Sequence, residues 1–210
     1  MLTGLERVAF LALVLLSITL SFTTFSRMFK VISRGTDPLD WRAIIRNWPR
    51  GLAIFLSQKT LFKTRPIVGA IHAGVAWGFT LYLLVNVIDV LYGMIPNFRF
   101  LPNSMFGDVY RFFVDFFSML VLLGVVVFLF RRFIFKDKRL ETNDPVMLGP
   151  SAKKGIKRDS VIVGLFIVLH VGFRFVGASF EIALHGSDYS QPGANFIASL
   201  WTNLSYSSLV

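Results

Sequence analysis

Two histidines lie inside apolar stretches that are long enough to cross a bilayer. His72 belongs to the stretch 67–93 and His170 to the stretch 161–184. Burying an imidazole in hydrocarbon costs free energy unless a hydrogen-bond partner or a metal compensates for the lost water. An ionisable residue at such a depth is therefore taken, as a first hypothesis, to have a function. A neutral imidazole nitrogen is a good axial ligand for haem iron. The two histidines therefore predict a haem-binding membrane protein, with His72 as the preferred ligand.

Small residues surround His72. Gly69 and Gly74 lie within one turn of it, and Gly74 forms a G-x-x-x-G pair with Gly78. Such a pair lets another helix backbone approach closely. The same lack of side chains would let a flat macrocycle lie against the helix, so we expect Gly69 and Gly74 to line the cofactor site. The alternative is a His72 ring that is hydrogen-bonded to a neighbouring helix.

His170 and Arg174 are four residues apart, so they share one face of a helix. Arg174 would suit a haem propionate, an anion that needs a buried cation; its alternative is an ion pair with an acidic side chain. By residue counting, His72 and His170 differ in depth by about 6 Å. The sequence therefore leaves four roles open for His170. It could ligate the same haem as His72, ligate another haem, form a hydrogen bond with a quinone, or make a polar contact with another helix. Arg111 and Asp115, also four residues apart, are expected to satisfy each other.

The composition is that of a membrane protein. Of the 210 residues, 54% are hydrophobic and 23 are phenylalanine. Crossing hydrocarbon takes about 20 apolar residues, and four runs approach or exceed that length. They are 8–25, 67–93, 109–130 and 161–184. We expect an all-α, polytopic membrane helix bundle with four transmembrane helices, the first of them a retained helix rather than a cleaved signal peptide.

The net charge of +10 is distributed in blocks. Of the 22 basic residues, eight fall in 30–65 and nine in 131–158, whereas 94–108 contains only Arg99. This alternation follows the positive-inside rule and argues against a nucleic-acid partner. It predicts one membrane domain over 1–210 with the N-terminus outside. The basic loops 30–66 and 131–159 would be cytoplasmic. The first would contain interfacial helices over 41–46 and 51–62, and the second would be irregular over 135–159, which contains Pro145, Gly149, Pro150 and Gly155. The segment 185–210 would be an outer loop with the start of a further helix.

Spaced single residues of the chain resemble a known family. They are Arg34, Gly35, Asp37, Arg42, Arg50, Gln58, Lys59, Pro66, Gly69, His72, Trp77, Gly78 and Phe79, and later Asp115, Arg131, Arg132, Lys138, Arg139, Leu140, Asp144, Gly172, Phe173, Glu181, Ile182 and Ala183. The pattern resembles the membrane domain of bacterial heterodisulfide-reductase-related iron–sulfur proteins, relatives of the gamma (cytochrome b) subunit of respiratory nitrate reductase. That family includes the membrane oxidoreductase that passes electrons from electron-transfer flavoprotein to menaquinone.

The resemblance implies a five-helix haem b domain fused to a cytoplasmic domain with two cysteine-rich iron–sulfur motifs. The sequence departs from that pattern, because it has no cysteine and no fifth span. Iron–sulfur clusters are therefore expected only on a partner or on a segment outside this sequence. Of the family's ligand positions His72 carries over, whereas His170 matches none.

These patterns together predict a haem b membrane subunit that carries electrons between a cytoplasmic iron–sulfur protein or flavoprotein and the quinone pool. The chain would be part of a quinone-linked oxidoreductase rather than catalytic alone. Menaquinone is the expected quinone and the bacterial inner (cytoplasmic) membrane the expected location. The basic loops suit an acidic partner. The alternative is a haem-free structural subunit that scaffolds a larger membrane complex.

Overall fold

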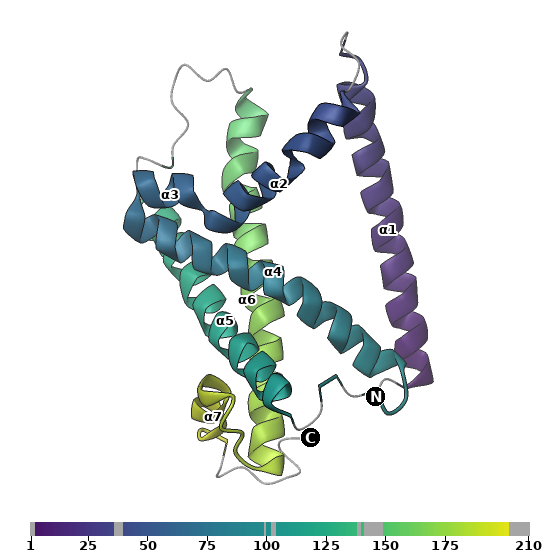
Figure 1. Ribbon diagram of the computed structural model, residues 1–210, viewed down its shortest axis with the longest axis vertical. Helices are drawn as coiled ribbons and strands as arrows, with labels where there is room; N and C mark the ends of the chain where they lie inside the picture. The colour runs from purple at the N-terminus through teal and green to yellow at the C-terminus, as the bar shows by residue number, and fades with distance from the viewer. Residues whose placement is uncertain are drawn as a thin grey trace. The chain divides into compact units, whose positions relative to one another are not determined.

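The computed structural model describes residues 3–35, 40–98, 100–101, 104–137, 140 and 149–201. Within these ranges all regular secondary structure is helical (Figure 1). Four helices are long and apolar enough to cross a membrane. They are α1 (Gly4–Ile32), α4 (Pro66–Met94), α5 (Met105–Leu129) with its continuation η1 (Phe130–Ile134), and α6 (Pro150–His185). The predicted all-α membrane fold with four spans is confirmed.

Three shorter helices complete the described structure. These are α2 (Trp41–Ser57), α3 (Lys59–Thr64) and α7 (Pro192–Ala198). Two separate helices were expected around Pro49, but α2 runs through this proline. The second basic loop was expected to be irregular up to residue 159, yet α6 already begins at Pro150. Proline is compatible with a first helical turn because the N–H that it lacks would have no partner there.

The chain divides into two compact units. The first consists of Met1–Lys59 and Asn86–Phe100, and the second of Thr60–Val85 and Leu101–Val210. The first unit contains α1 and α2, neither of which has a buried side chain. The second unit contains the cores of α4, α5 and α6, and it positions the candidate site described below.

Glycines of α4 lie on the contact with α5. A Cβ atom at Gly74 would lie 2.6 Å from Cδ2 of Leu120, and one at Gly78 would lie 2.4 Å from Cγ2 of Val121. Both distances are far below a normal carbon–carbon contact of about 3.5 to 4.0 Å. The G-x-x-x-G pair therefore serves close helix packing, as small residues do in membrane helices.

A buried hydrogen bond joins the same two helices. The hydroxyl groups of Tyr82 and Ser118 are 2.6 Å apart. Because Ser118 already donates its single proton to the carbonyl oxygen of Val114, Tyr82 donates to Ser118. Tyr82 packs in a core cluster with Val121 of α5 and Val171 of α6. This cluster fixes the level of α4 against its two neighbours.

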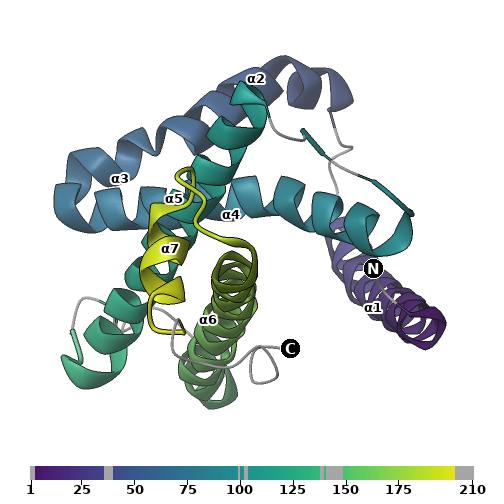
Figure 2. The same cartoon turned by 90° about the horizontal axis from the view of Figure 1, so that it is seen from below.

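The short helix α7 lies against α5 and α6 (Figure 2). Its first backbone N–H groups donate to the carboxylate of Asp115 on α5, from Gly193 at 2.7 Å and from Ala194 at 2.9 Å. Arg111, which was expected to pair with Asp115, instead pairs with Asp108 and Asp188. The expectation was wrong because the partner of Asp115 lies almost 80 residues away in sequence.

Candidate cofactor site

A cavity of about 660 Å³ opens beside His72 within the second unit. This volume falls in the range of about 300 to 1,000 Å³ that is usual for small-molecule and cofactor sites. The cavity is lined by residues of α3, α4, α5 and α6 and of the segments that join them. Its walls are mostly apolar, with side chains such as Val68, Val125, Phe128 and Ile167.

The imidazole of His72 is accessible from this cavity. His72 lines the cavity, and its side chain is exposed in the isolated chain. Its ring lies 6.2 Å from the ring of Phe128, measured between centroids. Among the described residues no hydrogen bond to the His72 ring is present. An accessible imidazole with unengaged nitrogen atoms beside an apolar space is the arrangement that a metal-centred cofactor or a hydrogen-bonding ligand requires.

Three cationic side chains belong to the wall of the cavity. Arg65, Arg131 and Arg132 line it, together with one carboxylate, that of Asp159. Arg131 is held by Asp137, with its Nε atom 2.8 Å from the carboxylate oxygen. Over the described part of the chain, Arg65 and Arg132 form no ion pair. The cavity is thus suited to a largely apolar ligand that also carries negative charge.

The two consecutive arginines that line the cavity lie in a π-helical turn. The end of α5 widens into the π-helix Phe130–Ile134, in which the N–H of Phe135 donates to the carbonyl oxygen of Phe130 at 3.0 Å. The turn continues with the N–H of Asp137 and the carbonyl oxygen of Arg131, 3.3 Å apart. Such π turns occur mostly as single turns within α-helices, and often at functional sites.

His170 lies in a different environment. Its ring stacks on Phe166 at a centroid distance of 5.7 Å and meets Tyr82 edge-on at 6.2 Å. Tyr82 follows His72 by ten residues on α4, which corresponds to a rise of about 15 Å. His170 is half-buried and does not line the cavity. The structure therefore does not bring the two histidines together as ligands of one iron.

Some of the other predicted site residues line the cavity and the rest do not. Gly69 lines the cavity, and a Cβ atom there would lie 2.8 Å from the carbonyl oxygen of Leu61. Gly74 packs against α5 as described above, away from the cavity. Arg174 is half-buried one turn beyond His170, and it too does not line the cavity. Of the predicted set, His72 and Gly69 share the site, whereas Gly74, His170 and Arg174 lie elsewhere.

The arginines at the cavity were missed as site residues. Arg65, Arg131 and Arg132 were recognised in the sequence only as part of the charge that orients the spans. The signal that could have found them is their position, because each stands within a few residues of the end of an apolar run. Helices packed side by side bring such ends to one level.

A second polar cluster lies near the start of α5 and the end of α6. Asp188 is 2.9 Å from the Nε atom of Arg111, and it also accepts hydrogen bonds from the side chain of Gln191 and the backbone of Ser190. Burial alone would raise the pKa of the Asp188 carboxyl, but the hydrogen bonds and the charge of Arg111 outweigh it and lower the pKa. The phenol of Tyr189 donates to Asp108, which raises the pKa of Tyr189. Asp188 thus links Arg111 of α5 to the loop that follows α6.

Comparison of the chain with models of known protein families, with curated proteins and with solved structures finds no match.

Proposed function

We propose that the chain is a haem b subunit of a membrane electron-transfer complex and that His72 would ligate the haem iron. The observation that carries this proposal is the accessible imidazole of His72 on the wall of a mostly apolar cavity that arginines also line. An apolar space excludes water, an imidazole ligates iron, and cations offset the charge of an anionic ligand end.

The residues of the cavity fit a haem that is held through one ligand of this chain. His72 would supply the ring nitrogen, and Phe128 flanks the imidazole. Arg65 and Arg132 would offset the two negative charges of the propionates. When bound, the haem supplies one-electron redox chemistry, while the protein sets its potential through ligation, charge and burial.

A second axial ligand would come from outside the described part of this chain. His170 is unsuitable because it lies beside Tyr82, about 15 Å further along α4 than His72. A histidine of a partner subunit or of a further helix would meet the requirement. This agrees with the family that the sequence resembles, in which a fifth helix brings further haem-ligating histidines.

The electron partners follow from the resemblance and from the charge pattern. We propose a cytoplasmic iron–sulfur protein or flavoprotein on one side and a quinone, menaquinone by the resemblance, on the other. The basic segments 30–65 and 131–158 would attract an acidic partner, since surface charge mainly speeds and orients an encounter. The location proposed is the bacterial inner membrane.

A haem-free structural subunit is the second candidate, and one observation favours it. No side chain of α1 is buried, so the helix presents apolar side chains around its whole circumference. A helix that is hydrophobic all round is suited to lipid or to other membrane helices. In this candidate function the chain would hold larger subunits together.

The haem content of the purified complex tests the first proposal against the second. Extraction into alkaline pyridine identifies and counts haem b without depending on its ligands in the protein. Haem b in stoichiometric amount, with a b-type band that a soluble menaquinol analogue reduces, is the expected result. A complex without haem that falls apart when this chain is deleted would contradict the proposal and support the scaffold.

A further inference from the structure

Helix α2 has two chemically distinct faces. With about 3.6 residues per turn, one face carries Trp41, Ile44, Ile45, Trp48, Leu52, Phe55 and Leu56. All seven side chains are exposed, Ile45 to 72% and Trp48 to 66%. A soluble helix would bury such a face in a protein core. The face of α2 is instead open in the first unit.

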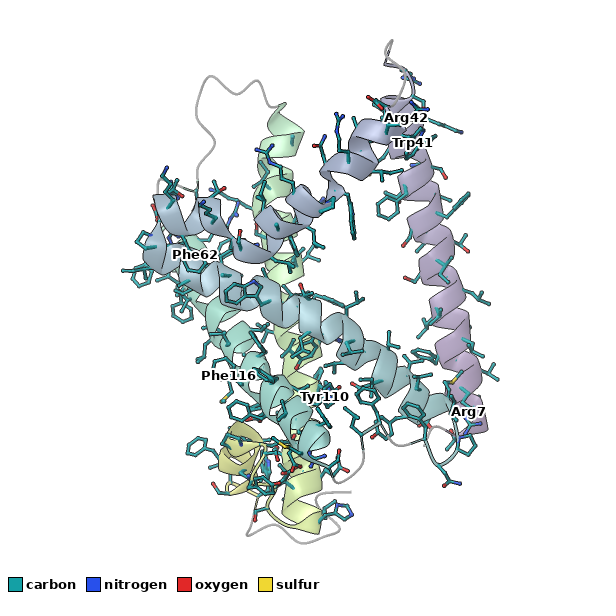
Figure 3. The ribbon with its side chains drawn as sticks, viewed as in Figure 1. Arg7, Trp41, Arg42, Phe62, Tyr110 and Phe116 are labelled. Atoms are coloured by element: carbon teal, nitrogen blue, oxygen red, sulfur yellow. The ribbon has the colours of Figure 1, made fainter. Side chains whose placement is uncertain are left out.

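The opposite face of α2 is cationic. Arg42, Arg46 and Arg50 follow one another at intervals of four residues, so they form a stripe along the helix. The helix itself has no acidic residue to neutralise them, and the carboxylate of Asp40, before its first turn, caps the backbone N–H of Ala43. Figure 3 marks Trp41 and Arg42, the first residues of the apolar face and of the stripe. The stripe therefore needs anions from outside the helix.

Short chain segments connect α2 to two candidate membrane spans. Eight residues separate Ile32, the end of α1, from Trp41, so the two residues lie at most about 32 Å apart. At its other end, α2 continues through Gln58 into α3, and α3 ends two residues before α4 begins. Both α1 and α4 are long and apolar enough to cross a membrane, whereas α2 is not among such helices.

We propose that α2 lies in the plane of the bilayer surface, with its apolar face in the acyl boundary and its arginine stripe bound to the headgroups of anionic phospholipids. Amphipathic helices with arginine on one face and tryptophan on the other occupy this position. Trp41 and Trp48 suit the level of the headgroups, where aromatic rings with a polar edge are enriched. The occupant of the surface is thus lipid, and the site is independent of the haem.

Charge complementarity makes this binding selective for anionic lipid. Each Lys or Arg near an anionic surface contributes roughly a fivefold preference, and added salt weakens it. Zwitterionic headgroups offer the arginines no net negative charge. We therefore expect α2 to select phosphatidylglycerol over phosphatidylcholine from the lipids around it.

The chain has no cysteine, so one introduced thiol labels one position. Leu52→Cys on the apolar face and Ala53→Cys on the opposite side are a matched pair of sites for a bimane fluorophore. The full chain is reconstituted into phosphatidylcholine vesicles that contain phosphatidylglycerol, with bromine on the acyl chains of one lipid or of the other. Brominated chains quench the fluorophore only at short range.

We expect strong quenching at Leu52→Cys and weak quenching at Ala53→Cys, with brominated phosphatidylglycerol the better quencher. Replacing Arg42, Arg46 and Arg50 by Gln should lower the relative association of phosphatidylglycerol about fivefold per arginine. The triple Lys variant should keep the preference, because it keeps the charge. Far-UV circular dichroism of each variant establishes that the helices are intact.

Two results would overturn the proposal. The first is the absence of quenching at Leu52→Cys by either lipid, which would place the apolar face on protein. The second is equal quenching by the two brominated lipids, with no change in the Gln variant. This result would mean that the arginines do not bind anionic lipid and are available to an acidic protein. Neither result depends on haem, so the failure of this proposal and the failure of the proposed function are separable.

Discussion

The carboxylate of Asp115, in the interior of α5, accepts a hydrogen bond of 2.7 Å from the backbone N–H of Gly193 at the start of α7. Asp115 is only 2% exposed, and Ala194, the second donor, is fully buried. A Cβ atom at residue 193 would lie 2.5 Å from the sulfur of Met119. One buried carboxylate and the space that a glycine leaves therefore hold α7 on α5.

Asp115→Ala is expected to destabilise the second unit. It removes the acceptor of two buried N–H groups, and an unsatisfied buried donor costs about 1 to 3 kcal/mol. We expect the free energy of unfolding in bicelles to fall by about 3 kcal/mol. Glu181→Gln is the matched control, because Glu181 is exposed, and it should change stability by less than about 0.5 kcal/mol. Equal effects of the two substitutions would contradict the role of Asp115.

Gly78→Ala should separate α4 from α5. The new methyl group would lie 2.4 Å from Cγ2 of Val121, so helix or side chain must shift, and overpacking of this kind costs about 1 to 3 kcal/mol. The control is Gly177→Ala, where no atom lies within 4 Å of the added carbon. Thermal unfolding of both variants compares the positions. A Gly78 variant as stable as the Gly177 variant would show that the two helices do not pack through this glycine.

Tyr82→Phe should remove a hydrogen bond with little change in packing. Because Tyr82 donates to Ser118, the phenylalanine variant leaves one lone pair of Ser118 without a donor. Hydrogen bonds between membrane helices average about 0.6 kcal/mol and reach about 1.7 kcal/mol. A double-mutant cycle with Ser118→Ala should give a coupling energy in that range, and strictly additive effects would mean that the two hydroxyl groups do not interact.

The loop around Asp188 should lose stability in acid. The pKa of Asp188 is lowered below its ordinary value of 3.8, because the hydrogen bonds and Arg111 favour the charged carboxylate over the opposing effect of burial. The stabilisation is therefore complete above the ordinary value and is lost as the pH falls through the lowered pKa. When the free energy of unfolding is measured from pH 7 to pH 2, it should fall less in Asp188→Asn than in the unsubstituted protein. An identical pH profile for the variant would contradict the assignment.

The sequence predicted the spans because their signal is local. A run of about 20 apolar residues suffices to identify a membrane helix, and the four runs correspond to α1, α4, α5 and α6. The start of α6 was missed because Gly149 and Pro150 were taken as loop signals, although proline fits a first turn. The helices α2 and α3 were predicted in outline, as the segments 41–46 and 51–62, whereas α2 runs through Pro49 to Ser57.

The candidate site was predicted only in part, because its neighbours come from distant segments. His72 could be singled out by its depth, and the small Gly69 beside it lines the same cavity. The position of His170 beside Tyr82 depends on the level at which α6 packs on α4, which no spacing along the chain reveals. In the same way, the bond from Gly193 to Asp115 could not be deduced from i, i+4 spacing.

The redox difference spectrum of a matched pair of variants tests the central claim most directly. His72→Gln and His170→Gln make the same chemical change in two imidazoles of the second unit, one exposed and one half-buried. We predict that the reduced-minus-oxidised spectrum of the purified complex shows a b-type α-band, which His72→Gln abolishes and His170→Gln retains. An unchanged band in the His72 variant would contradict the account, as would the absence of a band in the unsubstituted complex.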